Sequence, residues 1–184
     1  LPRDAAFYDA LSEKDAGHAW PENFEIRQSK LQENDANGTL PERYVFVPFQ
    51  VPSDMQILAL SPWIDDMKAL HAQIYKLAAA NPSQHFVIKE HPSFPLSVQG
   101  QIEGLPNIRF ANHAVTRDLL DASEAVITIN STVGLEALVL GKKVITLGNA
   151  HYAIDGLVLQ ADDSAMLHAK FSMLADWTPN AARR

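Results

Sequence analysis

From Tyr44 to the C-terminus, short apolar runs alternate with longer amphipathic stretches. The runs are continuously apolar, as in strands that are covered on both faces. Between the first two runs, apolar residues such as Met67, Leu70 and Ile74 recur at helical spacing. Strands that alternate with helices predict right-handed βαβ units and an α/β fold with a parallel sheet flanked by helices. We predict strands at 44–49, 85–90, 107–111, 125–129 and 143–148, and helices at 61–82, 116–123, 131–141 and 162–177.

The first part of the chain lacks this alternation. Residues 4–13 and 20–32 are typical of short helices, and residues 34–42 are rich in turn formers. We therefore predict a helical or linker extension at 1–43 and one α/β domain at 44–184. Because the chain begins with Leu1, we also expect it to be a piece of a longer protein.

Composition narrows the classes of function. With 184 residues, 47% of them hydrophobic and 20% charged, the chain suits one soluble α/β domain. Its formal net charge of -7 argues against a nucleic-acid partner, which usually requires a basic surface. The chain has no cysteine, which excludes disulfides and thiol catalysis and favours a cytoplasmic, reducing compartment. No apolar run approaches the roughly 20 residues that a transmembrane helix needs.

Unusual residues gather in the loops that follow the predicted strands, where parallel α/β sheets bind ligands. In INSTVG, Ser131 is a good N-cap for the next helix. We expect the amides from Thr132 to Gly134 to be free donors, and the missing side chain of Gly134 to let a bulky anion approach. The loop therefore predicts a phosphate site. An ordinary helix cap is the alternative.

The segment KEHP ends the second predicted strand. His91 could donate a hydrogen bond to a phosphate or act as an acid, and Lys89 could add positive charge. Pro92 stops the strand, and a solvated turn is the alternative.

Four further residues have two readings each. Asp54 could cap a helix or serve as a carboxylate at the mouth of the first strand. Glu136 could face solvent or bind a ribose hydroxyl. Tyr152 and Asp155 follow the last predicted strand and could belong to a binding loop or a surface turn. The sequence contains no HExxH motif, paired CxxC or DxD, so we expect no metal site.

In this order, the segments VPFQVPSD, KEHP and INSTVGLEALVLGKKVITLGNAHYAIDGL resemble the bacterial capsule polysaccharide biosynthesis and export family. The similarity runs from Tyr44 to Leu157. Proteins of this family resemble, or are, retaining β-Kdo glycosyltransferases that use CMP-Kdo. The similarity implies that this chain is the C-terminal, Rossmann-like, donor-binding half of a two-domain GT-B fold. The partner half would be a missing N-terminal Rossmann-like domain, and a glycan or glycolipid acceptor would lie across the cleft.

The resemblance also assigns roles to residues of this chain. It implies that His91 and Pro92 contact CMP, that Ser131 and Thr132 hold its phosphate, and that Asp54 is the catalytic carboxylate. It implies no metal or other cofactor beyond the CMP-Kdo donor. The full predicted set is Asp54 and His91 for catalysis, with Gln50, Lys89, His91, Pro92, Asn130, Ser131, Thr132, Gly134, Glu136 and Tyr152 for donor binding.

Two other functions fit the same residues. A glycerophosphotransferase of the teichoic-acid type would also use a GT-B scaffold and a cytidine nucleotide, CDP-glycerol. A non-catalytic nucleotide-sugar-binding module would account for the short chain. For the leading hypothesis we expect a cytoplasmic protein, peripheral to the inner face of the bacterial inner membrane.

Overall fold

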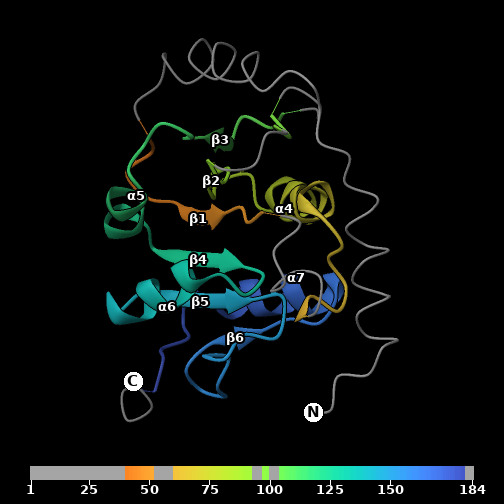
Figure 1. The fold of residues 1–184 in the computed structure, drawn as a ribbon, viewed down its shortest axis with the longest axis vertical. Helices are drawn as coiled ribbons and strands as arrows, with labels where there is room; N and C mark the ends of the chain where they lie inside the picture. Colours follow the sequence, from red (N-terminus) through yellow and green to blue (C-terminus); the bar gives the residue numbers. More distant parts are fainter. Residues whose placement is uncertain (1–39, 52–59, 93–96, 100–103, 181–184) are drawn as a thin grey trace.

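The computed structural model describes residues 40–51, 60–92, 97–99 and 104–180 of the chain. The helices expected at 4–13 and 20–32 lie outside these residues, and so does Asp54. Within the described part, six strands form one sheet in the order β3-β2-β1-β4-β5-β6, and every neighbouring pair is parallel (Figure 1). This confirms the predicted parallel sheet. The strands are β1 (Val45–Pro48), β2 (Phe86–Lys89), β3 (Ile108–Phe110), β4 (Ala125–Thr128), β5 (Lys143–Thr146) and β6 (Leu159–Gln160).

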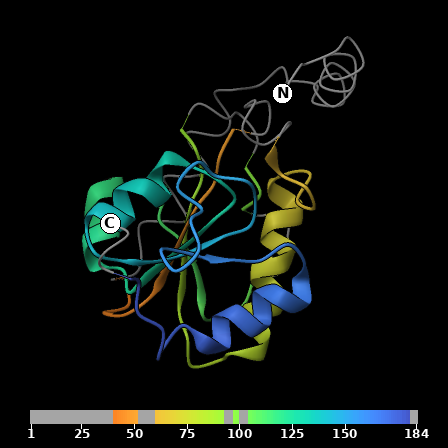
Figure 2. The ribbon, with the colours of Figure 1, turned by 90° about the horizontal axis from the view of Figure 1, so that it is seen from below.

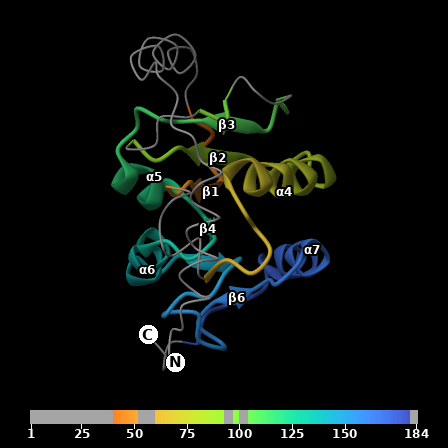
Figure 3. The ribbon, with the colours of Figure 1, turned by 45° about the vertical axis from the view of Figure 1, so that its right-hand side comes forward.

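Four helices of the described residues cover the two faces of the sheet. Helices α4 (Met67–Ala80) and α7 (Ser164–Met173) lie on one face. Helices α5 (Thr116–Ala122) and α6 (Thr132–Val139) lie on the other. Figures 2 and 3 show the sheet as the middle layer between these two pairs.

Alternate residues of β1, β2, β4 and β5 belong to different cores. Val45 and Val47 of β1 pack in the core that contains the buried side chains of α4 and α7. Tyr44 and Phe46 pack in the core of α5 and α6. All four side chains are at most 1% exposed. Because both faces are buried, the strands carry no polar alternation, which explains the continuous apolar runs.

The helices are shorter than predicted, and the difference is largest for α4 and α7. The helix expected from residue 61 begins at Met67, because Asp66 is its N-cap and its Oδ1 accepts the Ala69 amide hydrogen at 2.7 Å. Pro62 therefore lies before the helix. The last helix, expected at 162–177, is α7, which follows the N-cap Asp163.

The sequence analysis missed strand β6. It has two residues, and Leu159 pairs with Ile145 of β5. A strand this short has no recognisable periodicity, so only its pairing reveals it.

The strand order changes direction at β1. This strand pairs with β2 on one side and with β4 on the other. In open α/β sheets the crevice at such a switch point, beyond the carboxyl ends of the strands, is where ligands bind. The loops that follow β1, β2 and β4 therefore define the region of the candidate site.

Helix α6 ends in a turn that requires glycine. Gly141 has a φ of 78°, its N–H donates to the Leu138 carbonyl at 3.0 Å, and the Lys142 N–H donates to the Ala137 carbonyl at 2.9 Å. This is the Schellman arrangement, in which a left-handed residue satisfies the last carbonyls of the helix.

Replacing Gly141 with alanine should lower the free energy of unfolding by about 1 kcal/mol, because a Cβ is strained in the left-handed region. Chemical denaturation measures this. Gly104→Ala is the matched control, since a Cβ at Gly104 would meet nothing within 4 Å. Equal stability of the two variants would contradict the expected strain.

Candidate site at the carboxyl edge of the sheet

Two amide side chains join across the switch point. The Gln50 Nε2 donates to Asn130 Oδ1 at 3.0 Å, and the Asn130 backbone N–H donates to Gln50 Oε1 at 3.3 Å. Both residues are buried, at 6% and 3% exposure. The pair fixes the loop after β1 against the loop after β4. The structure thus brings these two predicted residues together, and their hydrogen bonds hold the two loops in place.

Three predicted residues lie at the same level of adjacent strands. Pro48 pairs with Lys89, and the Phe49 N–H donates to the Lys89 carbonyl at 2.8 Å, so the pairing of β1 and β2 continues beyond the strands. Gln50 and His91 each follow two residues after that pair. The register of β1 and β4 places Asn130 opposite Gln50. Gln50, His91 and Asn130 therefore line one row across three strand ends.

The start of α6 offers fewer free donors than predicted. Ser131 is the N-cap, as predicted, but its Oγ accepts the Val133 N–H at 3.2 Å and its carbonyl accepts the Gly134 N–H at 2.9 Å. The expectation that all three amides are free is therefore wrong for Val133 and Gly134. Within the described part of the chain, Thr132 alone of the three keeps an amide without an acceptor. That amide, two hydroxyls and the helix dipole remain for an anion.

Gly134 is small for a reason that the sequence analysis missed. A Cβ there would lie 2.8 Å from Cζ and 3.0 Å from Cε2 of Tyr152. The Tyr152 hydroxyl donates to the Ser131 carbonyl. Burial raises the pKa of Tyr152, so its phenol stays protonated. Tyr152 thus fills the space beside Gly134 and supports the helix start, whereas contact of either residue with a donor stays a prediction.

The residues of KEHP have different environments. The Lys89 ammonium donates to the carbonyls of Asn112 at 2.8 Å and Ala114 at 2.7 Å, so it holds the loop after β3. His91 is half-buried and Pro92 is exposed. Glu90, which the sequence analysis did not select, is only 4% exposed. The sequence does contain a signal for Glu90, because an acidic residue lies between Lys89 and His91 at the end of a predicted strand.

The remaining predicted residues belong to elements outside this row. Glu136 is exposed on α6. The pKa of Arg117 on α5 is raised mainly by its hydrogen bond to Asp121, and the negative charge of Glu136 raises it to a smaller degree. Asp155 is exposed in the loop after β5. A role in donor binding stays a prediction for both carboxylates.

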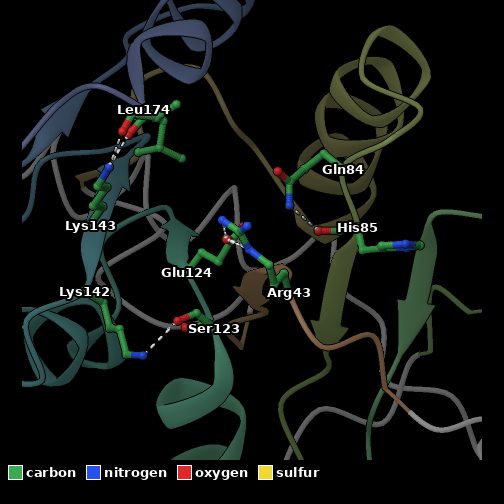
Figure 4. Close-up of polar contacts among 9 residues, drawn as sticks. Arg43, Gln84, His85, Ser123, Glu124, Lys142, Lys143 and Leu174 are labelled. Atoms are coloured by element: carbon green, nitrogen blue, oxygen red, sulfur yellow. Dashed lines mark hydrogen bonds and ion pairs between the residues drawn. The ribbon is translucent and has the colours of Figure 1, made fainter.

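A groove of about 470 Å³ lies at the opposite, amino edge of the sheet, lined in part by Val45, Ala125 and Lys143, where β1, β4 and β5 begin. Its charged groups already have partners, as Figure 4 shows. Arg43 forms an ion pair with Glu124. The Lys143 ammonium donates to the carbonyls of Leu174 at 2.6 Å and Ala175 at 2.8 Å. We therefore locate the candidate site at the carboxyl edge.

The neighbouring lysine has a similar contact on the other face. The Lys142 ammonium donates to the carbonyl of Ser123 at 2.8 Å, just after α5 (Figure 4). It also donates to the carbonyl of Asp121 at 2.7 Å. Each lysine satisfies carbonyls at a helix C-terminus, where a positive charge is favourable.

Two kinds of feature are absent from the described residues. No group of three or more histidine, aspartate or glutamate side chains there could hold a metal ion. None of the helices in the described ranges has the length and hydropathy that crossing a membrane would require.

The chain belongs to the capsule polysaccharide biosynthesis protein family, whose model matches residues 19–174. This confirms the resemblance seen in the sequence. The chain is 43% identical over 180 residues to protein FixF of Sinorhizobium fredii, covering 98% of this chain and 44% of FixF. It is 32% identical over 147 residues to the capsule polysaccharide export protein KpsS of Escherichia coli, covering 74% of this chain and 38% of KpsS. The chain thus spans less than half the length of these relatives.

Among solved structures, the chain is similar to the Thermosulfurimonas dismutans KpsC β-Kdo 2,7 transferase, with a TM-score of 0.52 and 23% identity over 83% of this chain and 49% of that chain. Its structural neighbours also include GT-B glycosyltransferases and UDP-GlcNAc 2-epimerases. These likenesses support the Rossmann-like α/β fold predicted from the sequence. At these identities they define the fold and leave the reaction open.

The contact between Gly134 and Tyr152 predicts a coupled effect on stability. Gly134→Ala should lower the free energy of unfolding by about 1–3 kcal/mol, because the new methyl group overpacks against the ring. In a Tyr152→Phe background the penalty should be smaller, since the phenol oxygen is the nearest atom to the new Cβ. Denaturation of the four proteins in this cycle measures the coupling. An equal penalty in both backgrounds would refute the contact.

Proposed function

We propose that this chain is the donor-binding domain of a retaining glycosyltransferase that transfers Kdo from CMP-Kdo to a bacterial surface polysaccharide or glycolipid. The observation that carries the proposal is the row of Gln50, His91 and Asn130 at the switch point, beside the start of α6. Membership of the capsule biosynthesis family supports the acceptor class. The KpsC neighbour is a β-Kdo transferase, which supports Kdo as the transferred sugar.

In the proposed complex the phosphate of CMP lies at the start of α6. The Thr132 amide and the hydroxyls of Ser131 and Thr132 face it, and the positive end of the helix dipole adds to their attraction. The His91 imidazole donates to a phosphate oxygen from the end of β2, which lies on the other side of β1. When the bond to the sugar breaks, CMP gains negative charge, and donors already in place lower the free energy of that transition state.

The proposed reaction also needs a carboxylate. Retention requires a nucleophile or an ion-pair partner for the oxocarbenium-like centre, and Asp54 follows Gln50 by four residues in the sequence. We propose Asp54 for this role. The acceptor would enter from the other Rossmann-like domain of the full-length protein, which we place in the cytoplasm at the inner face of the inner membrane. The proposed partners include no nucleic acid.

His91→Ala in the full-length protein should lower turnover on the order of a hundredfold, because one charge-stabilising donor is lost. The rate of CMP release from CMP-Kdo measures it. His168→Ala is the matched control: this histidine lies on α7, and its backbone carbonyl, which accepts from Ser172, is kept. Unchanged turnover in His91→Ala would exclude the assigned role.

A donor panel tests the reaction itself. Release of CMP from CMP-Kdo, with retained anomeric configuration in the product, is the expected result, and a chelator should leave the rate unchanged. Release from CDP-glycerol instead would identify a glycerophosphotransferase. Calorimetric binding of CMP without turnover of either donor would identify a non-catalytic module.

A further inference from the structure

Glu90 is a buried carboxylate directly before His91, at the end of β2. Burying a charged carboxylate is costly unless its oxygens receive hydrogen bonds. The residue does not belong to the strand-end row, and its contacts therefore need an explanation of their own.

Both carboxylate oxygens of Glu90 hold the chain that follows His91. Oε1 accepts the Val98 N–H at 2.6 Å, and Oε2 accepts the Ser97 hydroxyl at 2.8 Å. The carboxylate thus holds Ser97 and Val98 beside the end of β2. Hydrogen bonds to a carboxylate are among the stronger hydrogen bonds in proteins.

Asn112 links the same carboxylate to the loop after β3. Its Nδ2 donates to Glu90 Oε2 at 3.0 Å, while its Oδ1 accepts the Glu90 N–H at 2.8 Å. The Ala111 N–H still pairs with the Ile88 carbonyl, so the Asn112 side chain continues the pairing where the backbone turns away. The Lys89 ammonium holds the carbonyl of Asn112 from the other side.

We infer that Glu90 is a positioning residue that fixes the chain around His91 before the donor binds. The inference rests on the proposed function, in which His91 faces the donor phosphate. A histidine held in place loses little conformational freedom on binding, whereas an unrestrained one lowers the affinity by the cost of ordering it. The network therefore acts on donor affinity through the geometry of His91.

The direction of the hydrogen bonds in this network suggests a test in which the carboxylate at position 90 and the amide at position 112 change places. Glu90→Gln keeps one acceptor for the Val98 N–H but turns an N–H toward Asn112 Nδ2, so that two donors meet. Asn112→Asp alone places two carboxylates together. In the double variant Glu90→Gln, Asn112→Asp, the new amide at position 90 donates to the new carboxylate at position 112, which still accepts the backbone N–H of residue 90. The formal charge equals that of the wild-type protein.

Calorimetry with CMP on the full-length protein tests the inference. Each single variant should raise the Kd for CMP about tenfold, equivalent to the loss of one charged hydrogen bond, and the double variant should return to within about threefold of wild type. Glu42→Gln, an exposed carboxylate at the amino edge, is the control and should bind like wild type. A network that serves only stability would lower Tm in the single variants and leave the Kd unchanged, which would overturn the inference.

Hydrogen exchange of the Val98 amide separates this inference from the proposed function, because it needs no ligand. Exchange should be at least about tenfold faster in Glu90→Gln and slow again in the double variant. If the wild-type protein fails to bind CMP, the proposed function is wrong, and so is the proposed effect of Glu90 on donor affinity. Hydrogen exchange in the variants still decides whether Glu90 orders the segment at Val98. Unchanged exchange in Glu90→Gln would overturn the positioning itself.

Discussion

The parallel pairing of β1 with both β2 and β4 is the constraint on which the rest of this structure depends. The strand is buried on both faces and lies where the strand order reverses. Its register sets the level of the loops on either side, and so it aligns Gln50 with His91 and with Asn130. A slip of one residue would turn every side chain of β1 into the other core and break this alignment.

Polar groups at the carboxyl edge are satisfied mainly by one another. Gln50 pairs with Asn130, Tyr152 with the Ser131 carbonyl, and Glu90 with Asn112. Such internal pairing keeps the edge in one arrangement and leaves few groups to be reorganised when a ligand arrives. Among the described residues, the Thr132 amide has no acceptor, and it marks where a ligand can gain most.

The sequence predicted the sheet well because burial on both faces leaves a plain signal in the apolar runs. It placed the start of α4 too early because Pro62 suits a first helical turn, whereas the hydrogen bond of Asp66 selects the true start. Strand-end residues were predictable from topology alone. The pairing of Gln50 with Asn130, which are 80 residues apart, and the contact of Tyr152 with Gly134 depend on tertiary packing that no local pattern encodes.

The two lysines at the start of β5 make the stability of the domain depend on which face of the sheet each residue of β5 points to. Because neighbouring residues of a strand point to opposite faces, Lys142 reaches the end of α5 and Lys143 reaches the end of α7. Exchanging the faces would remove both ammonium groups from their carbonyls at once. A misaligned β5 would therefore lose the lysine contacts at the ends of both α5 and α7. This loss favours the correctly folded domain over misfolded forms that differ only in the alignment of β5.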